Sequence, residues 1–170
     1  MTTGKQTAFM GVRGSIRCQE PMAKHTSWKV GGPARYFFEP RDCEDLTAFL
    51  QSLDVQVPVL WLGLGSNLLV RDGGFEGAVI AAHRGLRTMK HLGEGYLMAE
   101  AGVSCARFSR FAGRYGWTGA EFLAGVPGTM GGALAMNAGA FGGETWDMVE
   151  EVDLVDREGV FHRRPARSFA

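Results

Sequence analysis

A glycine-rich stretch holds the residues best suited to chemistry, and it reads GLGSNLLVRDGG over residues 63–74. Gly63 and Gly65 have no Cβ over the backbone and accept positive φ angles. Ser66 and Asn67 add a hydroxyl and an amide beside the exposed N–H groups. These features are typical of a loop that lets a phosphate or pyrophosphate approach the main chain. Each amide bond to a charged oxygen contributes roughly 1.5–3 kcal/mol.

Apolar runs at 57–62 and 78–82 flank this loop, which predicts that one strand enters it and a second strand leaves it. The better-known phosphate loops do not match. No Gly-Lys-Ser or Gly-Lys-Thr occurs in the chain, and Leu68 stands where a Rossmann fingerprint has its third glycine. Taken by itself, the stretch fits a glycine-rich hairpin without a ligand equally well.

A second glycine cluster, at residues 125–142, predicts a loop that leads into a short helix over 129–137. Pro127 suits a helix start, and Gly139 is expected to end the helix. The helix N-terminus would offer free N–H groups to an anion. Gly131 and Gly132 weaken the first turn by roughly 1 kcal/mol each against Ala. They indicate a close approach by a flat ligand or, alternatively, by another backbone in tight packing.

The remaining pattern supplies elements that would position these loops. A β-prone run at 35–39 is stopped by Pro40, and Asp42 then caps a helix. That helix has one apolar face, made of Leu46, Phe49, Leu50 and Leu53. Strand, helix, strand, loop and strand together predict an α/β unit.

Later in the chain, residues 96–101 predict a strand, and Ser104 is expected to cap a second helix that Gly116 ends. The apolar face of this helix comprises Phe108, Phe111, Ala112 and Tyr115. Its arginines, Arg107, Arg110 and Arg114, are interpreted as a solvated face rather than a phosphate site. A hairpin is predicted from runs at 152–155 and 160–163.

The first twenty residues are weakly patterned, so loose order is expected over 1–20. His25 is interpreted as a polar loop residue near Trp28 rather than as a catalytic base, because the sequence identifies no partner for it.

Composition narrows the classes of protein. The formal net charge is zero, which does not favour nucleic acid or an anionic membrane surface as a partner. The cysteines Cys18, Cys43 and Cys105 are far apart and form no Cys-x-x-Cys, so free thiols are expected and no metal site. The first residues lack the apolar region of a signal peptide, and no apolar run approaches the ~20 residues of a membrane span. We therefore expect a cytoplasmic protein.

Three motifs together resemble one family, at residues 25–34 (HTSWKVGGPA), 63–74 and 125–144. The family is UDP-N-acetylenolpyruvoylglucosamine reductase, also called UDP-N-acetylmuramate dehydrogenase, of bacterial cell-wall synthesis. The resemblance implies the FAD-binding fold of the vanillyl-alcohol-oxidase or PCMH type, an α+β fold built of α/β lobes. In this chain the lobes would span 21–83 and 84–170, the second one incomplete.

The resemblance also implies the chemistry. FAD would be bound, NADPH would be the hydride donor, and a UDP-sugar enolpyruvyl ether would be the substrate. The first loop would hold the FAD pyrophosphate, the second would pack against the pyrophosphate and the flavin, and residues 137–139 would lie near the ring. The cofactor-binding residues implied in this way are Gly63, Leu64, Gly65, Ser66, Asn67, Leu68, Gly125, Val126, Pro127, Gly128, Thr129, Gly131, Gly132, Asn137, Ala138 and Gly139.

One departure from the family pattern is the length of the chain. The substrate-binding Tyr-Arg pair, the proton-donating serine and the late glutamate of the family would fall beyond Ala170, so no catalytic residue is expected within these residues. The chain is thus expected to be a truncated FAD-binding part without turnover by itself. Two alternatives are a stand-alone FAD- or nucleotide-binding module and another FAD oxidoreductase of the PCMH type.

Overall fold

The computed structural model describes residues 9–169. Its first part is a four-stranded sheet with the order β1-β2-β4-β3. The strands are β1 (Ser15–Pro21), β2 (Pro33–Glu39), β3 (Val59–Leu62) and β4 (Phe75–Ala81). The 3-10 helix η2 (Met22–Lys24) begins the connection from β1 to β2. The sequence predicted the last three strands, whereas β1 lies partly where loose order was expected, so that expectation is wrong for residues 15–20. Residues 1–8 of the same expectation lie outside the described residues.

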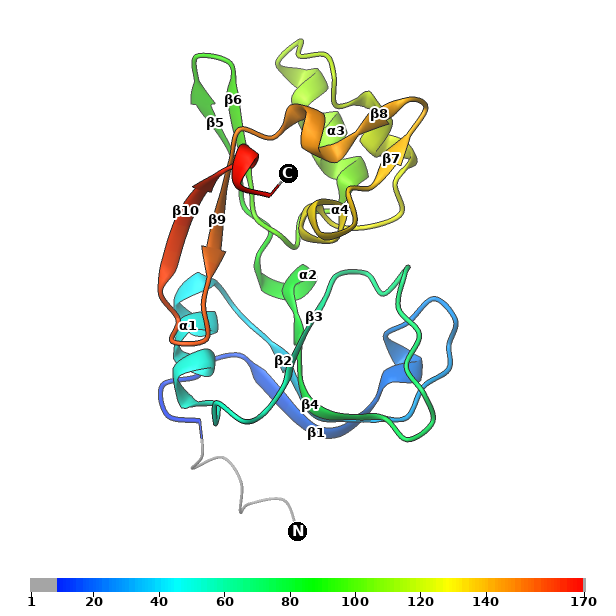
Figure 1. The fold of residues 1–170 in the computed structure, drawn as a ribbon, viewed down its shortest axis with the longest axis vertical. Coiled ribbons are helices and arrows are strands. Elements are labelled where there is room, and N and C mark those ends of the chain that lie inside the picture. Colours follow the sequence, from blue (N-terminus) through cyan, green and yellow to red (C-terminus); the bar gives the residue numbers. More distant parts are fainter. Residues whose placement is uncertain (1–8, 170) are drawn as a thin grey trace.

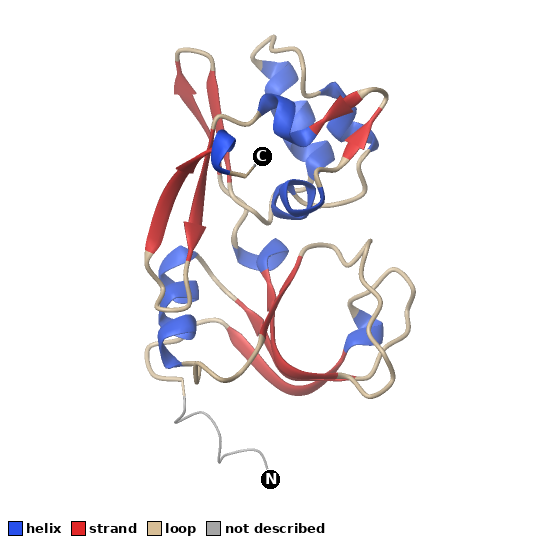
Figure 2. Cartoon of the chain, viewed as in Figure 1, coloured by secondary structure: helices blue, strands red, loops and turns tan. Residues whose placement is uncertain are grey.

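The strand directions decide between the two interpretations of the first glycine loop. Strands β3 and β4 are hydrogen-bonded neighbours and run parallel, with Leu60 beside Val79 and Leu62 beside Ala81. A hairpin requires antiparallel strands, so the hairpin interpretation is wrong. The connection over residues 63–74 is instead a crossover made only of loop, as Figure 2 shows.

Each face of this sheet has its own core. Helix α1 (Cys43–Ser52) covers one face, where its predicted apolar side chains pack with Phe38 and Ile80. Its cap is as predicted, because the Asp42 side chain accepts a hydrogen bond from the Asp45 N–H. On the other face, Phe37, Val79 and Leu62 pack with Met22 and Val70, which come from the two long loops. The glycine loop is therefore anchored by apolar contacts on one side of the sheet.

The second part of the chain follows the one-turn helix α2 (Ala82–Gly85). It contains a hairpin, three helices, a short second hairpin and a further 3-10 turn around one core that includes Phe108, Leu123 and Met130. The elements are β5 (Met89–Gly93), β6 (Tyr96–Ala99), α3 (Cys105–Arg114), η3 (Glu121–Gly125), α4 (Met130–Met136), β7 (Gly139–Ala140), β8 (Gly143–Glu144) and η4 (Thr145–Met148). In Figure 1, α2 lies between this part and the sheet, with α4 facing the sheet part.

Two predicted helix ends in this part need correction. Ser104 occupies the cap position of α3, but its side chain makes no capping hydrogen bond. Helix α4 ends at Asn137 in the left-handed conformation, with φ of 44°, and not at Gly139, which begins β7. Asn tolerates this conformation better than most residues, which explains the earlier end. Gly116, by contrast, follows α3 with φ of +72°, as predicted for a stop.

The predicted last hairpin is present as β9 (Glu151–Val155) and β10 (Phe161–Pro165), followed by η5 (Ala166–Ser168). Its turn returns to the first part and lies against α1 (Figure 1). There the Thr47 hydroxyl donates to the Gly159 carbonyl at 3.4 Å and Arg157 donates to the Val57 carbonyl at 2.7 Å. This contact ties the last hairpin to the first part of the chain.

Candidate FAD site

The first glycine loop leaves the carboxyl end of β3, where open parallel sheets place their ligands. Gly65 has φ of +71°, which a residue with a side chain rarely adopts. Within the part of the chain that the structure describes, the backbone N–H groups of Gly63, Leu64, Gly65, Ser66 and Asn67 donate to no protein acceptor. Five consecutive free donors in a glycine-containing loop form a suitable cradle for an anionic ligand.

The amino-terminal motif supports this loop from behind. The Ser27 N–H donates to the Gly65 carbonyl at 3.0 Å, and a Cβ on Gly65 would lie only 2.0 Å from the His25 carbonyl oxygen. Farther along, the Gly32 N–H donates to the Arg71 carbonyl at 3.0 Å. The motif at residues 25–34 and the loop at 63–74 therefore form one packed unit, with glycine where the two backbones touch.

His25 lies in the loop directly after η2, as predicted, and it has a partner that the sequence did not reveal. Its Nε2 lies 2.9 Å from Oε1 of Glu20, and its ring stacks on Phe37 with centroids 4.1 Å apart. Burial tends to raise the pKa of Glu20, but the hydrogen bond with His25 and the nearby Arg17 and Lys24 charges together hold it below its ordinary value. The pair joins β1 to the loop behind Gly65.

The second glycine cluster differs from the expectation of a free helix N-terminus. All four N–H groups of the first turn of α4 are bonded within the protein. Met130 donates to the Val103 carbonyl and Gly131 donates to the Ala101 carbonyl. Gly132 donates to the Thr129 hydroxyl, and Ala133 donates to the Thr129 carbonyl. The expectation that this terminus presents free donors to an anion is therefore wrong. Thr129 is the predicted helix start and serves as its cap.

The two glycine clusters meet each other. A Cβ on Gly63 would lie 2.6 Å from Oγ1 of Thr129, and a Cβ on Gly128 would lie 3.9 Å from Oγ of Ser66. The structure thus brings the predicted residues 63–66 beside residues 128–129, although more than sixty positions separate them in the sequence. The wall formed by the second cluster faces the free donors of the first.

Gly131 and Gly132 have different neighbours, which answers the question the sequence left open. A Cβ on Gly131 would lie 2.8 Å from the Ala101 Cβ, so this glycine allows close packing inside the protein. A Cβ on Gly132 would meet only Oγ1 of Thr129, at 3.5 Å, and Gly132 is exposed. Only Gly132 therefore leaves room that a ligand would use.

The other predicted residues fall into two groups. The Ser66 and Asn67 side chains are exposed and make no hydrogen bond within residues 9–169. Leu64 and Leu68 flank them on the same loop. In the second cluster, Gly125, Val126 and Pro127 precede Gly128. The Asn137 side chain is instead occupied by the protein, since it donates to Glu144 at 2.7 Å and accepts from the Trp146 N–H at 3.2 Å.

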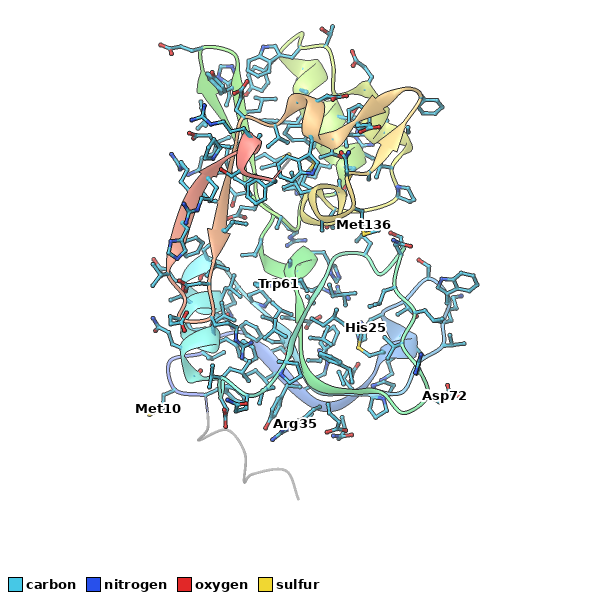
Figure 3. The ribbon with its side chains drawn as sticks, in the orientation of Figure 1. Met10, His25, Arg35, Trp61, Asp72 and Met136 are labelled. Carbon is cyan, nitrogen blue, oxygen red and sulfur yellow. The ribbon has the colours of Figure 1, made fainter. Side chains whose placement is uncertain are left out.

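Residues 138 and 139 are also explained by contacts inside the protein. The Ala138 carbonyl accepts the Thr145 hydroxyl at 2.6 Å, and Gly139 pairs with Glu144 in the small hairpin. Among residues 137–139, the structure therefore shows a folding role and no group directed at the first loop. Figure 3 places Met136, at the end of α4, across from His25 and Asp72 of the sheet part.

Two hollows of the surface lie away from these loops. One, of about 640 Å³, is lined by Arg13, Glu39, Arg41 and Arg84, and a smaller one of about 260 Å³ lies beside Phe9. The candidate site is instead an open surface of backbone donors beside a glycine wall. Such a surface fits a long anionic cofactor better than a small enclosed substrate, so the residues present fit FAD.

Comparison with known proteins agrees with this geometry. A family described as FAD binding domain matches residues 34–163. A UDP-N-acetylenolpyruvoylglucosamine reductase of Methylococcus capsulatus is 56% identical over 147 residues, which cover 86% of this chain and 48% of that protein. A second, from Alkalilimnicola ehrlichii, is 55% identical over 156 residues. The chain spans about half the length of these curated relatives.

Solved structures show the same fold. The UDP-N-acetylenolpyruvylglucosamine reductase of Thermus caldophilus superposes with a TM-score of 0.69 at 30% identity, over 92% of this chain and 53% of that chain. A solvent-stable cholesterol oxidase superposes with a TM-score of 0.65 at 16% identity over 89% of this chain and 32% of that one, a likeness in fold alone. The predicted PCMH-type fold is confirmed.

The reductase resemblance predicted from three motifs is likewise confirmed by relatives that match about nine-tenths of the chain. With free backbone donors at the carboxyl end of β3 and a family match that includes both glycine clusters, the chain belongs to the FAD binding domain family.

Proposed function

We propose that this chain is the FAD-binding part of a UDP-N-acetylenolpyruvoylglucosamine reductase, which forms UDP-N-acetylmuramate with NADPH as hydride donor. The observation that carries the cofactor assignment is the row of N–H groups from Gly63 to Asn67 that have no acceptor in the described part of the chain. The similarity to the reductases named above supports the assignment of the reaction.

The first loop supplies the anion-binding groups in this proposal. Its five N–H donors would hold the pyrophosphate of FAD, and the unbonded Ser66 and Asn67 side chains would add hydrogen bonds. Hydrogen bonds to a charged acceptor contribute roughly 1.5–3 kcal/mol each, so even part of this row would be enough to retain the cofactor. Gly65 keeps the row in place because only glycine fits against the His25 carbonyl.

The second cluster supplies the wall. Its helix donors are used internally, so its contribution is shape: Gly128 and Gly132 are the positions where the cofactor would approach the backbone. When bound, FAD carries a hydride between the nicotinamide donor and the enolpyruvyl double bond. The residues of this chain bind and orient the cofactor, and the sequence places no acid for the substrate among them.

The two lobes and the setting are part of the same proposal. We take residues 21–83 and 84–170 as the lobes between which FAD lies, with β1 added to the first lobe. A nucleotide-sugar substrate and NADPH are metabolites of the cytoplasm, which supports a cytoplasmic location.

The test is the visible spectrum of the purified 170-residue chain after incubation with FAD and desalting. We expect retained flavin bands, and loss of the bands when Gly65 is replaced by Ala. A folded but colourless protein would contradict the assignment of these loops as a sufficient cofactor site. In the same sample we expect no NADPH oxidation that depends on the enolpyruvyl substrate.

A further inference from the structure

The turn of the last hairpin is the main polar link between the two parts of the molecule. Within residues 9–169, five hydrogen bonds join the sheet part, before α2, to the second part, after α2, from positions far apart in the sequence. Nη2 of Arg157 donates three of the five. The other two are the bond from Thr47 to Gly159 and a long bond from Sγ of Cys43 to Oε1 of Glu100, at 3.6 Å.

The three acceptors of Arg157 are backbone carbonyls of the sheet part. Nη2 lies 2.7 Å from the Val57 carbonyl oxygen and 3.3 Å from those of Asp54 and Val55. These residues form the turn that follows α1, and the Val57 N–H closes it by donating to the Asp54 carbonyl at 2.9 Å. Hydrogen bonds from a charged donor are stronger than those between neutral groups. One partly buried guanidinium therefore gathers a whole turn of the sheet part.

The hairpin turn also fits α1 in shape. Gly159 is buried with φ of +79°, and a Cβ there would lie 2.8 Å from Cγ2 of Thr47. Val155, which precedes the turn, packs against the core under α1. The Asp156 carboxylate accepts the Val160 N–H at 2.8 Å and so holds the turn in its conformation. Apolar packing and the Arg157 bonds thus act at the same place.

The two glycine clusters lack such a link. No hydrogen bond within the described residues joins residues 63–68 to residues 125–132, although Gly63 lies beside Thr129. In Figure 1 the hairpin turn and α1 lie on one side of α2, and the first glycine loop lies on the other side. Polar contacts therefore hold the two parts together away from the place where FAD would bind.

We propose that Arg157 is a positioning residue for the cofactor site. By holding the last hairpin to the turn after α1, it keeps the wall of the second cluster opposite the free donors of the first loop. Two compact parts joined by a short connection move relative to each other unless contacts hold them. A site that is aligned in only a fraction of the molecules binds its ligand more weakly by that fraction. The inference rests on the proposed function, because it concerns the affinity for FAD.

The test compares variants of the 170-residue chain. Arg157→Ala removes the donors, Arg157→Gln is a milder change to a shorter neutral side chain, and Arg157→Lys keeps the charge. Arg163→Ala is the matched control, because Arg163 lies on the same hairpin but bonds to Asp153 of that hairpin, at 2.7 and 3.0 Å. FAD affinity is measured by titration of flavin fluorescence. The relative orientation of the two parts is measured without FAD, from residual dipolar couplings of the backbone amides.

We expect the couplings of both parts to fit one common orientation in the parent chain and two separate orientations in Arg157→Ala. Within each part they should still fit the structure, which separates a loss of positioning from a loss of folding. FAD binding should weaken at least about fivefold in Arg157→Ala, the lower end of typical coupling between sites. Arg157→Lys should recover most of the affinity, and Arg163→Ala should match the parent in both measurements.

Two results would overturn the inference while leaving the proposed function intact. One is a single common orientation in Arg157→Ala, and the other is FAD affinity within twofold of the parent. If Arg157→Ala does not fold, the same two results in Arg157→Gln decide the question. A parent chain that binds no FAD would instead contradict the proposed function, and the positioning role would fail with it.

Discussion

The two glycine clusters look alike in sequence but use their backbones differently. In the first, the N–H groups of residues 63–67 have no acceptor among residues 9–169, whereas in the second every N–H of the first turn of α4 is bonded inside the protein. Glycine in the first cluster brings two loops together and leaves donors free. Glycine in the second allows a helix to pack on residues 101–103 and keeps one face bare.

This difference teaches that glycine content indicates close approach but does not say what approaches. At Gly65 and Gly131 the approaching group is another part of the same protein, whereas a Cβ on Gly132 would meet only Oγ1 of Thr129, at 3.5 Å. A helix N-terminus is an anion site only while its donors are free, and a short helix anchored by loop carbonyls has none to offer. Substitutions within the two clusters test this division.

The largest effect is expected for Gly65→Ala. The new Cβ would meet the His25 carbonyl at 2.0 Å in a left-handed backbone, so the free energy of unfolding should fall by roughly 2–4 kcal/mol and FAD should be lost. Chemical denaturation and flavin absorbance measure the two effects. Gly73→Ala is the control, because a Cβ there meets nothing within 4 Å; an equal loss in both variants would contradict the assigned packing.

The next comparison is Gly131→Ala against Gly132→Ala. The first should lower the free energy of unfolding by about 1–3 kcal/mol, since its Cβ would crowd Ala101. The second should raise it by about 0.5–1 kcal/mol, because Ala favours a helix over Gly.

For Gly132→Ala, FAD affinity should fall although the free energy of unfolding rises. Gly132→Ala should bind FAD several-fold more weakly despite its greater stability, which a titration of flavin fluorescence would show. Unchanged affinity in this variant would mean that the bare face of α4 is not part of the cofactor site.

A smaller effect is expected at Thr129, which joins the two clusters. Thr129→Val removes the hydroxyl that accepts the Gly132 N–H at 3.3 Å, and loss of such a cap costs about 1 kcal/mol. Thr129→Ser keeps the hydroxyl and should remain within about 0.5 kcal/mol of the parent. Equal losses in both variants, measured by thermal unfolding, would indicate that the methyl group and not the cap matters.

The smallest effect concerns Glu20 behind the first loop. Because the pKa of folded Glu20 lies below its unfolded value, its stabilisation is present above about pH 4.5 and is lost as the pH falls through the folded pKa. Glu20→Gln should lower the free energy of unfolding by about 0.5–1 kcal/mol near pH 7, as for a charged hydrogen bond near the surface.

The pH dependence is the decisive measurement for this variant. The difference between parent and Glu20→Gln should shrink below pH 4.5 in denaturation experiments. A constant difference across that range would exclude the carboxylate charge as its source.

Short-range patterns predicted much of the fold correctly. The Asp42 cap and the apolar face of α1, the strands on both sides of the first loop and the last hairpin all depend on residues within a few positions of one another. Strand β1 was missed because its partner β2 lies beyond a long loop, and an edge strand with few apolar residues has little pattern of its own.

The candidate site was predicted in part. The residues of both loops were identified, and the structure brings Gly63 beside Thr129. The Glu20–His25 pair was not identified, because this contact depends on the three-dimensional path of the chain from β1 into the following loop. Trp28 is 68% exposed, and the ring that stacks on His25 is that of Phe37.

The sequence alone determined most of the helices and strands, the family resemblance and the two places where the backbone comes close to another group. These follow from local propensity and from residue types that tolerate special conformations. Only the tertiary structure decided which N–H groups remain free, because a donor is free or satisfied according to acceptors distant in the chain. The carbonyls of Ala101 and Val103 take up donors at the start of α4, whereas the loop that joins the parallel strands β3 and β4 has no protein acceptor for its N–H groups at residues 63–67 within the described residues.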